Sequence, residues 1–273
     1  MTGRLVICPT PIGNLEDVTL RVLSALREAD VVACEDTRRT RVLLDRYGVK
    51  ARLVSYHEHN EKGRASELVR RMRDGAVVAL VSDAGMPLIS DPGFLLVRGC
   101  VAAGLPVEVL PGPSAAITAL VASGLPADEW HFHGFLPRKK GDLRRAITEA
   151  AGTLVAFESP RRVATTLALV AELDPQRQVA VCRELTKAHE EIVRGSAVEL
   201  AARYADAPPK GEVVLVLGPP SPAAAAGAEG PAGLDALRRL VDAGAHPRKA
   251  AAVVAELTGG SANALYRALT ADR

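Results

Sequence analysis

Short runs rich in β-branched residues alternate with amphipathic helical patterns through the first half of this 273-residue chain. The strand-like runs occupy 4–10, 31–37, 52–57, 76–85 and 106–112, and the helical patterns occupy 16–29, 38–48, 61–75 and 92–104. The runs show no strict alternation of apolar and polar residues, which is typical of strands buried on both faces. This order predicts an α/β fold with a mainly parallel sheet and helices on both faces.

The rhythm changes after residue 115. Five further strand candidates occur at 130–137, 153–160, 178–185, 190–197 and 211–218, but clear helical patterns separate only some of them. The segment 182–195 has the pattern of two strands joined by a polar turn, which predicts a mixed sheet in this half. We therefore predict an N-terminal α/β domain at 1–115 and a second α/β domain at 116–218.

A stretch rich in proline, alanine and glycine follows the second domain, and we predict that residues 219–233 form a linker. Residues 234–273 then contain three short helical patterns with a Gly-Gly turn before the third. Ser261 is expected to be the N-cap of the last helix. This arrangement predicts a helix-turn-helix-like module. The alternative is a small helical cap that packs on the body of the protein.

Three turns rich in glycine and proline follow predicted strands, at 10–19, 82–93 and 111–117. Open α/β sheets bind ligands at the carboxyl ends of their strands, where these turns are expected to lie. Glycine and proline make the backbone rigid and let a ligand approach it closely. None of the turns matches a phosphate loop or a complete G-x-G-x-x-G motif, so a pocket for another kind of small molecule is favoured.

Asp83 and Asp91 lie in the second of these turns. Asp91 precedes Pro92, Gly93 and a helical pattern, so we predict that it caps the helix. Asp83 ends a buried strand, which favours a carboxylate that accepts hydrogen bonds from ribose hydroxyls or an amino group of a ligand. A metal ion would need a third ligand of matching type nearby, and the stretch has none, so no metal site is predicted.

Residues 33–40 place Glu35 and Asp36 beside Arg38 and Arg39 after another predicted strand. Two interpretations stay open. In the first, Asp36 or Thr37 caps the following helix and the arginines are solvated. In the second, the arginines face a polyanion while Glu35 or Asp36 lines the ligand cleft.

Further basic residues follow predicted strands of the second half, at 138–140, at 161–162 and at Arg183. Clustered Lys and Arg provide the salt-sensitive, sequence-independent part of RNA binding, although the net charge of +2 neither favours nor excludes it. Aromatic residues make up only 3% of the chain, which argues against a stacking platform for single-stranded bases. The H-x-H pairs at 57–59 and 131–133 lack a third metal ligand at a convincing spacing, so we interpret them as ordinary polar histidines.

The four cysteines form no C-x-x-C pair, and three of them lie in apolar, strand-like runs. We predict that they are buried free thiols in a reducing compartment. The N-terminus has no apolar signal-peptide core, and no apolar run approaches the ~20 residues that span a bilayer. We therefore expect a cytoplasmic protein without a membrane partner.

Seven segments agree in order with one known family over residues 5–218. They are CPTPIGNLEDVTLRVLSALREADVVACEDTRRT, LVSDAGMPLISDPG, VEVLPGPSAAITALVASGLP, GFLPRK, FESPRR, RELTKAHEE and KGEVVLVLG. Together they closely resemble the bacterial 16S rRNA (cytidine-2'-O)-methyltransferases, which belong to the tetrapyrrole methylase superfamily. Met86 stands where Thr is expected, but a contact through its backbone would survive that change. The C-terminal segment is similar to the small helix-turn-helix-like module of many members.

The resemblance implies two α/β domains with a cleft for S-adenosylmethionine (SAM) between them, plus the small C-terminal helical module. SAM would be bent and held mostly by main-chain groups, with Phe157 and Leu185 closing over its adenine region. The implied cofactor-binding residues are Pro11, Ile12, Gly13, Asp83, Met86, Ser114, Ala115, Phe157 and Leu185.

The implied reaction is 2'-O-methylation of the ribose of a decoding-centre cytidine in 16S rRNA. The attacking hydroxyl must lose its proton, and the unranked candidate catalytic residues are Glu35, Asp36, Glu158, Glu184 and Lys210. The candidate RNA-binding residues are Arg38, Arg39, Arg138, Lys139, Lys140, Arg161, Arg162 and Arg183. The family also implies a homodimer. The alternatives are a relative that methylates a tetrapyrrole or another small substrate, and a ribosome-associated protein without catalysis, which the three intact loops disfavour.

Overall fold

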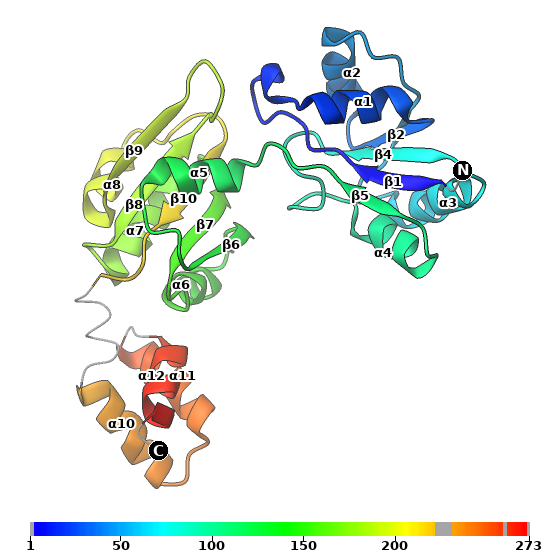
Figure 1. The fold of residues 1–273 in the computed structure, drawn as a ribbon. Helices are drawn as coiled ribbons and strands as arrows, with labels where there is room; N and C mark the ends of the chain where they lie inside the picture. The colour runs from blue at the N-terminus through cyan, green and yellow to red at the C-terminus, as the bar shows by residue number, and fades with distance from the viewer. Residues whose placement is uncertain (1–2, 222–230, 259–260, 272–273) are drawn as a thin grey trace. The chain divides into compact units, whose positions relative to one another are not determined.

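The computed structural model describes residues 3–221, 231–258 and 261–271 (Figure 1). The chain divides into two compact units, Met1–Thr118 and Ala119–Arg273. The predicted domain boundaries at residues 115, 218 and 233 stay predictions. Most of the predicted linker, residues 222–230, lies outside the described residues.

The first unit contains a five-stranded sheet in which all neighbouring strands are parallel. Across the sheet the order is β3-β2-β4-β1-β5. The strands are β1 (Arg4–Ile7), β2 (Val31–Cys34), β3 (Leu53–Ser55), β4 (Val77–Val81) and β5 (Val107–Val109). The helices between them are η1 (Leu15–Asp17), α1 (Leu20–Glu28), α2 (Thr37–Arg46), α3 (Glu61–Arg73) and α4 (Phe94–Ala102). The prediction of a mainly parallel sheet is confirmed.

Two apolar cores, one on each face of this sheet, hold the helices in place. The helices α1 and α2 pack against the face that carries Val6 and Val32. The helices α3 and α4 pack against the opposite face, which carries Leu5 and Val31. Successive residues of a strand point to opposite faces, so a sheet covered on both sides needs apolar residues at every position.

The parallel register brings the carboxyl ends of the strands to one edge of the sheet. Ile7 of β1 pairs with Leu80 of β4, and Cys34 of β2 pairs with Val81 of the same strand. The turns after the five strands therefore all leave the sheet at this edge, which is where ligands bind in α/β proteins.

The second unit contains a mixed sheet with the order β6-β7-β10-β8-β9, in which β6 and β7 are parallel and the other neighbours antiparallel. Its strands are β6 (Trp130–Phe135), β7 (Thr153–Glu158), β8 (Gln178–Arg183), β9 (Glu191–Ser196) and β10 (Val213–Leu217). The accompanying helices are α5 (Ala115–Ser123), which begins within the first unit, α6 (Lys140–Thr148), α7 (Val163–Leu173) and α8 (Ala197–Tyr204). The mixed sheet and the polar turn between β8 and β9 are confirmed.

Three helices near the C-terminus form a small core of their own. They are α10 (Pro231–Asp242), α11 (Pro247–Thr258) and α12 (Ala262–Ala271). Leu237, Val254 and Leu265, one from each helix, are buried together. The Ala264 amide donates to Ser261 Oγ at 3.3 Å, which confirms the predicted N-cap. Whether these helices act as a separate module or as a cap stays a prediction.

All four cysteines are buried and unpaired, as predicted. Among the described helices, none is both long enough and apolar enough to cross a membrane.

Candidate functional site

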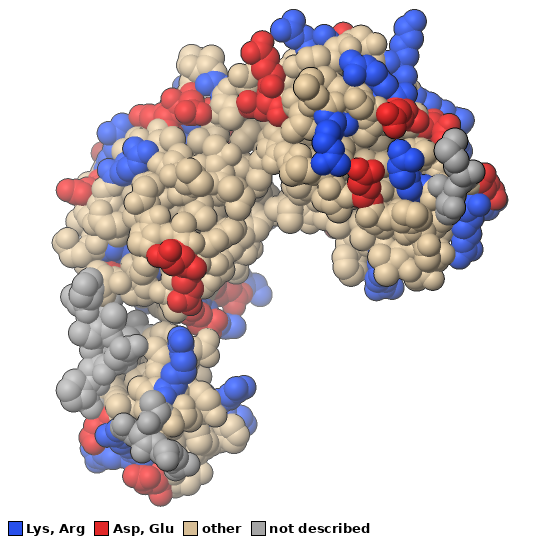
Figure 2. Space-filling model, in the orientation of Figure 1, with Lys and Arg blue, Asp and Glu red and all other residues tan. Residues whose placement is uncertain are grey.

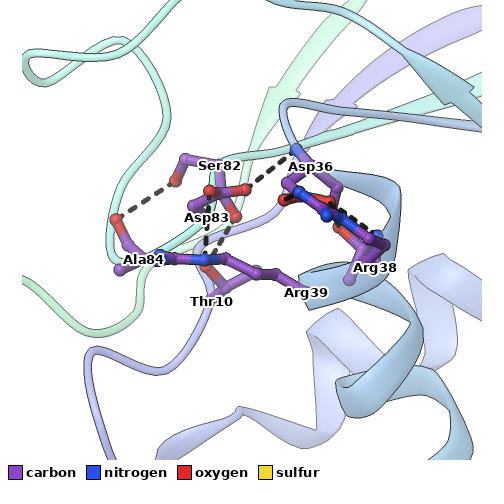
Figure 3. A network of polar contacts seen from close by, with 8 residues as sticks. Thr10, Asp36, Arg38, Arg39, Ser82, Asp83 and Ala84 are labelled. Carbon is purple, nitrogen blue, oxygen red and sulfur yellow. Dashed lines mark hydrogen bonds and ion pairs between the residues drawn. The ribbon is translucent and has the colours of Figure 1, made fainter.

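The turns that follow β1 and β4 are joined through their backbones. The Thr10 amide donates to the Gly85 carbonyl and the Gly85 amide donates to the Thr10 carbonyl, each at 2.9 Å. Thr10 Oγ1 also donates to the Ser82 carbonyl at 3.0 Å, and Figure 3 shows these two residues side by side. The two turns therefore form one rigid frame at the edge of the sheet.

The turn after β5 reaches the same place. A Cβ atom added at Gly85 would lie 3.4 Å from Ile12 Cγ2 and 3.7 Å from the Pro113 carbonyl oxygen. Gly85 also has a φ of +77°, a conformation that L side chains rarely adopt. All three turns that the sequence singles out thus converge at Gly85, beside the Ile12 side chain and the Pro113 carbonyl.

The 82–93 loop contains strained backbone. The φ angle is +74° at Leu88 and +67° at Ser90, and it is +143° at Gly93. A Cβ at Gly93 would lie 2.7 Å from Leu88 Cδ1, so only glycine fits there without a shift. Residues in such conformations cluster at ligand-binding sites and persist only where surrounding contacts hold them.

Asp83 connects the end of β4 to the end of β2. Its Oδ1 accepts a hydrogen bond from the Asp36 amide at 3.0 Å, and its Oδ2 lies 3.5 Å from Arg39 Nε (Figure 3). The sequence showed no structural reason for this carboxylate, and the structure supplies one. The side chain is still 22% exposed, which leaves room for a ligand. Its contact with a ligand stays a prediction.

Asp36 is the N-cap of α2, which confirms the cap of the first interpretation, while the second, in which these residues face a polyanion and line the cleft, stays a prediction. Its Oδ1 accepts from the Arg38 amide at 2.8 Å, and its two oxygens accept from the Arg38 guanidinium at 3.0 and 2.7 Å. The hydrogen bonds from Arg38 lower the pKa of Asp36 to about 2. Asp36 is therefore a weak base whose oxygens are already occupied.

The prediction that Asp91 caps α4 is wrong. The helix begins at Phe94 with Gly93 as its N-cap, and the Gly93 and Leu95 amides both donate to Glu61 Oε1, at 2.9 and 3.2 Å. The φ of +143° at Gly93 delays the first helical residue beyond the reach of a cap at Asp91. The amides that the local pattern assigned to Asp91 thus donate to Glu61, a carboxylate on α3.

Asp91 lies instead among other acidic groups at the edge of the sheet. Burial, and to a smaller extent the negative charges of Glu35 and Asp83, raise its pKa to about 6. Burial and the charge of Asp83 also raise the pKa of Glu35, against the opposing effect of Arg39. Shifted carboxyl groups of this kind are typical of functional sites.

The raised pKa of Asp91 makes the stability of the first unit depend on pH. The carboxyl group binds its proton more tightly in the folded protein, so its stabilising contribution is complete below about pH 4 and lost as the pH rises through about 6. Asp91→Asn should therefore raise the free energy of unfolding by about 1–2 kcal/mol at pH 8 and by little at pH 4. Urea unfolding at both pH values measures this. An equal gain at pH 8 from Asp45→Asn, an exposed position on α2, would contradict the prediction.

In the second unit, Glu158 and Arg162 hold the turn that follows β6. Glu158 Oε1 accepts from the Ser159 amide at 2.8 Å, and its Oε2 accepts from the Thr166 hydroxyl at 2.7 Å. Arg162 Nη1 lies 3.3 Å from Glu158 Oε1, and its guanidinium donates to the carbonyl oxygens of residues 136–137 at 3.0 and 2.5 Å. In the structure both residues hold the turn in place. The predicted roles, Glu158 as a base and Arg162 as a phosphate contact, stay predictions.

Arg183, the last residue of β8, and Glu184, which follows it, are also held by neighbours. Glu184 Oε1 accepts from the Glu212 amide at 2.8 Å and from Lys187 Nζ at 2.9 Å, and these bonds lower the pKa of Glu184. Arg183 Nε donates to the Lys210 carbonyl at 3.2 Å, and Lys210 itself is exposed. Glu184 is thus a weaker base than an ordinary carboxylate.

The predicted cofactor-binding residues fall into two groups. In the first unit, Pro11 and Ile12 are buried, Gly13 is exposed and Met86 is half-buried, all in the turns that meet at Gly85. Ser114 and Ala115, also in the first unit, lie where α5 begins, and the second group, Phe157 and Leu185, lies in the second unit.

Of the residues assigned to the second unit, Phe157 packs edge-to-face on Phe132 and Phe135, with ring centroids 5.0 and 5.5 Å apart. Leu185 is buried. Phe157 is partly exposed and offers some apolar surface, and the predicted closure of both residues over adenine stays a prediction.

The predicted RNA-binding residues differ in how freely they can reach a phosphate. Arg138, Lys139 and Arg161 are exposed. Lys140 Nζ lies 3.5 Å from Glu172 Oε2, while Arg38 and Arg39 pair with the carboxylates already described. On the face drawn in Figure 2, basic and acidic side chains of the first unit are interspersed and form no continuous patch of one sign. A polyanion bound to this face of the first unit would therefore contact separate basic side chains and not a continuous basic patch.

Within the described parts of the chain, no group of three His, Cys, Asp or Glu side chains could hold a metal ion.

Comparison with known proteins identifies the family. A model of the tetrapyrrole (corrin/porphyrin) methylases matches residues 4–201. The chain belongs to the tetrapyrrole methylase family. This confirms the resemblance that the sequence motifs indicated, and with it the methyltransferase class.

Two relatives match nearly the whole length of this methylase. It is 49% identical over 270 residues to a Mesorhizobium japonicum protein named ribosomal RNA small subunit methyltransferase I, with 97% of this chain and 90% of that one covered. It is 46% identical to a protein of the same name from Escherichia coli O157:H7, with 97% and 94% covered.

Solved structures show the same fold. Uroporphyrin-III-C-methyltransferase from Thermus thermophilus superposes with a TM-score of 0.56 at 23% identity, over 80% of this chain and 94% of that chain. A structure of the enzyme complexed with S-adenyl homocysteine has a TM-score of 0.56 at 24% identity, over 79% and 97%. The predicted architecture of the methylase, two α/β sheets followed by C-terminal helices, is confirmed.

Two residues near the site, Glu61 and Tyr56, were not predicted from the sequence. Tyr56, after β3, donates its hydroxyl to Glu61, and Glu61 accepts from the Gly93 and Leu95 amides at the start of α4, more than thirty positions further along the chain. A glutamate in the first turn of a helix is ordinary, and no local spacing points to so distant a bond.

Proposed function

We propose that this methylase transfers a methyl group from SAM to the ribose 2'-hydroxyl of the decoding-centre cytidine in 16S rRNA. The names of relatives that are 49% and 46% identical over nearly the whole chain support the small-subunit rRNA as substrate. The neighbour that holds S-adenyl homocysteine supports SAM as the methyl donor. The expected homodimer and cytoplasmic location stay predictions.

The observation that carries the proposal is the convergence of three rigid turns at Gly85. The Thr10–Gly85 backbone pair holds this frame together, and Gly85, with a φ of +77°, brings no side chain of its own to the meeting point. Such a surface fits a ligand held mostly by backbone, and the carboxylate of Asp83 beside it suits ribose hydroxyls or an amino group. We propose that the turn residues Pro11, Ile12, Gly13, Asp83, Met86, Ser114 and Ala115 hold SAM.

When bound, SAM supplies an electrophilic methyl group on a sulfonium. The 2'-oxygen forms a bond to the methyl carbon as the carbon–sulfur bond breaks, and the electron pair of that bond stays on sulfur. The rigid frame fixes one reactant so that oxygen, carbon and sulfur can lie in line. A water-poor surface favours the dispersal of the sulfonium charge in the transition state.

The hydroxyl proton must pass to a base, and we propose Glu35. Asp36 and Glu184 have lowered pKa values, and both oxygens of Glu158 accept hydrogen bonds inside the second unit. Glu35 is half-buried at the end of β2, and its pKa is raised by burial and by Asp83. A carboxylate with a raised pKa accepts a proton more readily at neutral pH.

Phosphate groups of the RNA would be met by the exposed Arg138, Lys139 and Arg161. A tetrapyrrole is the second candidate substrate, because a structural neighbour acts on uroporphyrin III. Uroporphyrinogen is therefore included in the test below.

The test follows radioactive methyl groups from SAM into 30S subunits, naked 16S rRNA and uroporphyrinogen. We expect transfer to a ribosomal substrate, a labelled 2'-O-methylcytidine after digestion, and resistance of one phosphodiester bond to alkali. Arg138→Ala with Lys139→Ala should raise KM for RNA several-fold and weaken its salt dependence. Absence of transfer to either ribosomal substrate, despite SAM binding, would refute the proposal.

A further inference from the structure

Glu61, the first residue of α3, is placed by a turn that a single side chain organises. Asn60 Oδ1 accepts from the His57 amide at 2.9 Å, and Asn60 Nδ2 donates to the Ser55 carbonyl at 3.2 Å. The Tyr56 amide donates to the Cys34 carbonyl at 2.8 Å, which ties the start of the turn to β2. These bonds fix the position of the turn before α3, and with it the position from which the Glu61 side chain extends.

One oxygen of Glu61 collects three hydrogen bonds. Glu61 Oε1 accepts from the Tyr56 hydroxyl at 2.9 Å and from the Gly93 and Leu95 amides at 2.9 and 3.2 Å. Tyr56 is fully buried, and burial together with the bond to Glu61 raises the pKa of its hydroxyl. The two amides are the unsatisfied donors at the start of α4, where the helix dipole also favours a negative charge. Hydrogen bonds to an ionised acceptor are the strong ones.

These bonds hold one end of the strained 82–93 loop. The other end is held by the Thr10–Gly85 backbone pair, and Leu88 and Ser90 lie between the two anchors in left-handed conformations. Strained conformations of this kind persist only when contacts on both sides determine them. Without Glu61, the Gly93 and Leu95 amides would lose their side-chain partner, and this end of the loop would be held only by the packing of α4.

We propose that Glu61 is a positioning residue for the SAM-binding loop. It touches no substrate in this assignment and acts by holding the 82–93 loop in the conformation that meets the methyl donor. The proposal rests on the proposed function, because it takes SAM to be the ligand of that loop. It adds a residue from α3 to a site that otherwise consists of the turns after the strands.

The test compares Glu61→Ala, Glu61→Gln and a control on the same helix, Glu67→Ala. Glu67→Ala also removes a carboxylate from α3, but the ion pairs that it breaks are with Arg64 and Arg71 of the same helix. Glu61→Ala should raise Kd for SAM by about tenfold or more while leaving KM for RNA unchanged. Glu61→Gln keeps an oxygen that can accept the same bonds and should stay within about threefold of wild type. Glu67→Ala should match wild type.

Hydrogen exchange of the ligand-free protein separates failure of this proposal from failure of the proposed function. Glu61→Ala should increase exchange in residues 86–95 and nowhere else, whether or not the wild type binds SAM. Unchanged exchange there, a Kd within twofold of wild type, or the same loss from Glu67→Ala would overturn the positioning role. Should Glu61→Ala fail to fold, Tyr56→Phe removes one of the three donors and keeps the ring, and it should show the same confined exchange with a Kd increase of about threefold.

Discussion

Replacing Asp83 with alanine should raise Kd for SAM by about 10- to 100-fold. The carboxylate joins the turn after β4 to the Asp36 amide at 3.0 Å and lies 3.5 Å from Arg39 Nε. A hydrogen bond to a charged group contributes about 1.5–3 kcal/mol, and 1.4 kcal/mol is a factor of ten in affinity. The variant loses the proposed bond to SAM and also the bridge that positions the loop. Titration calorimetry on the purified protein measures the effect.

Two further variants separate these causes. Asp83→Asn keeps an oxygen that can accept from the Asp36 amide but removes the charge, so a loss close to that of alanine would assign the effect to the ligand. Affinity close to wild type for Asn but not for Ala would assign it to the bridge. Asp45→Ala, which removes an exposed carboxylate from α2, should leave Kd unchanged. A Kd within twofold of wild type for Asp83→Ala would show that SAM does not need this carboxylate.

Replacing Glu158 with alanine should lower the free energy of unfolding of the second unit by about 3 kcal/mol. The side chain is 0% exposed and accepts from the Thr166 hydroxyl, and Arg162 pairs with it at 3.3 Å. Removal leaves a guanidinium and a buried hydroxyl without their partner, and breaking a buried ion pair in this way costs about 3–5 kcal/mol. Arg162 is partly exposed and keeps two carbonyl acceptors, which places the expected loss at the lower end.

The matched control is Glu172→Ala on α7, whose carboxylate pairs with Arg144 and Lys140 at the surface. Exposed pairs contribute less than about 1 kcal/mol, so this variant should unfold at nearly the wild-type denaturant concentration. Equal losses for the two variants would refute the structural role. A Glu158→Gln protein that is fully folded but has lost methyl transfer would instead return Glu158 to the candidate bases.

Local patterns were sufficient for the secondary structure. The apolar runs around Val6, Val32 and Val78 became parallel strands because residues buried on both faces need no alternation. Ser261 and Asp36 became N-caps because a short polar side chain reaches the amides two or three residues ahead wherever it precedes a helix. These interactions span a few residues, so the sequence contains everything needed to predict them.

Asp91 shows where this reasoning fails. Its position before Pro92 and Gly93 has every local sign of a cap, yet the amides at the start of α4 bond to Glu61. Packing of α3 beside α4 on one face of the sheet brings a competing carboxylate to the same donors. The structural contacts of Arg162 were equally out of reach of local patterns, because the carbonyl groups that it holds lie more than twenty residues before it.

The sequence by itself determined the order of strands and helices, the three glycine- and proline-rich turns, the caps at Asp36 and Ser261, and through its motifs the methylase family. Only the tertiary structure decided that the three turns meet at Gly85 and that Asp83 bridges two strand ends. It also decided that Glu61, and not Asp91, caps α4. The physical reason is distance along the chain: helix, strand and cap formation depend on neighbours within a few residues, whereas these contacts exist only after the parallel sheet has brought its strand ends to one edge.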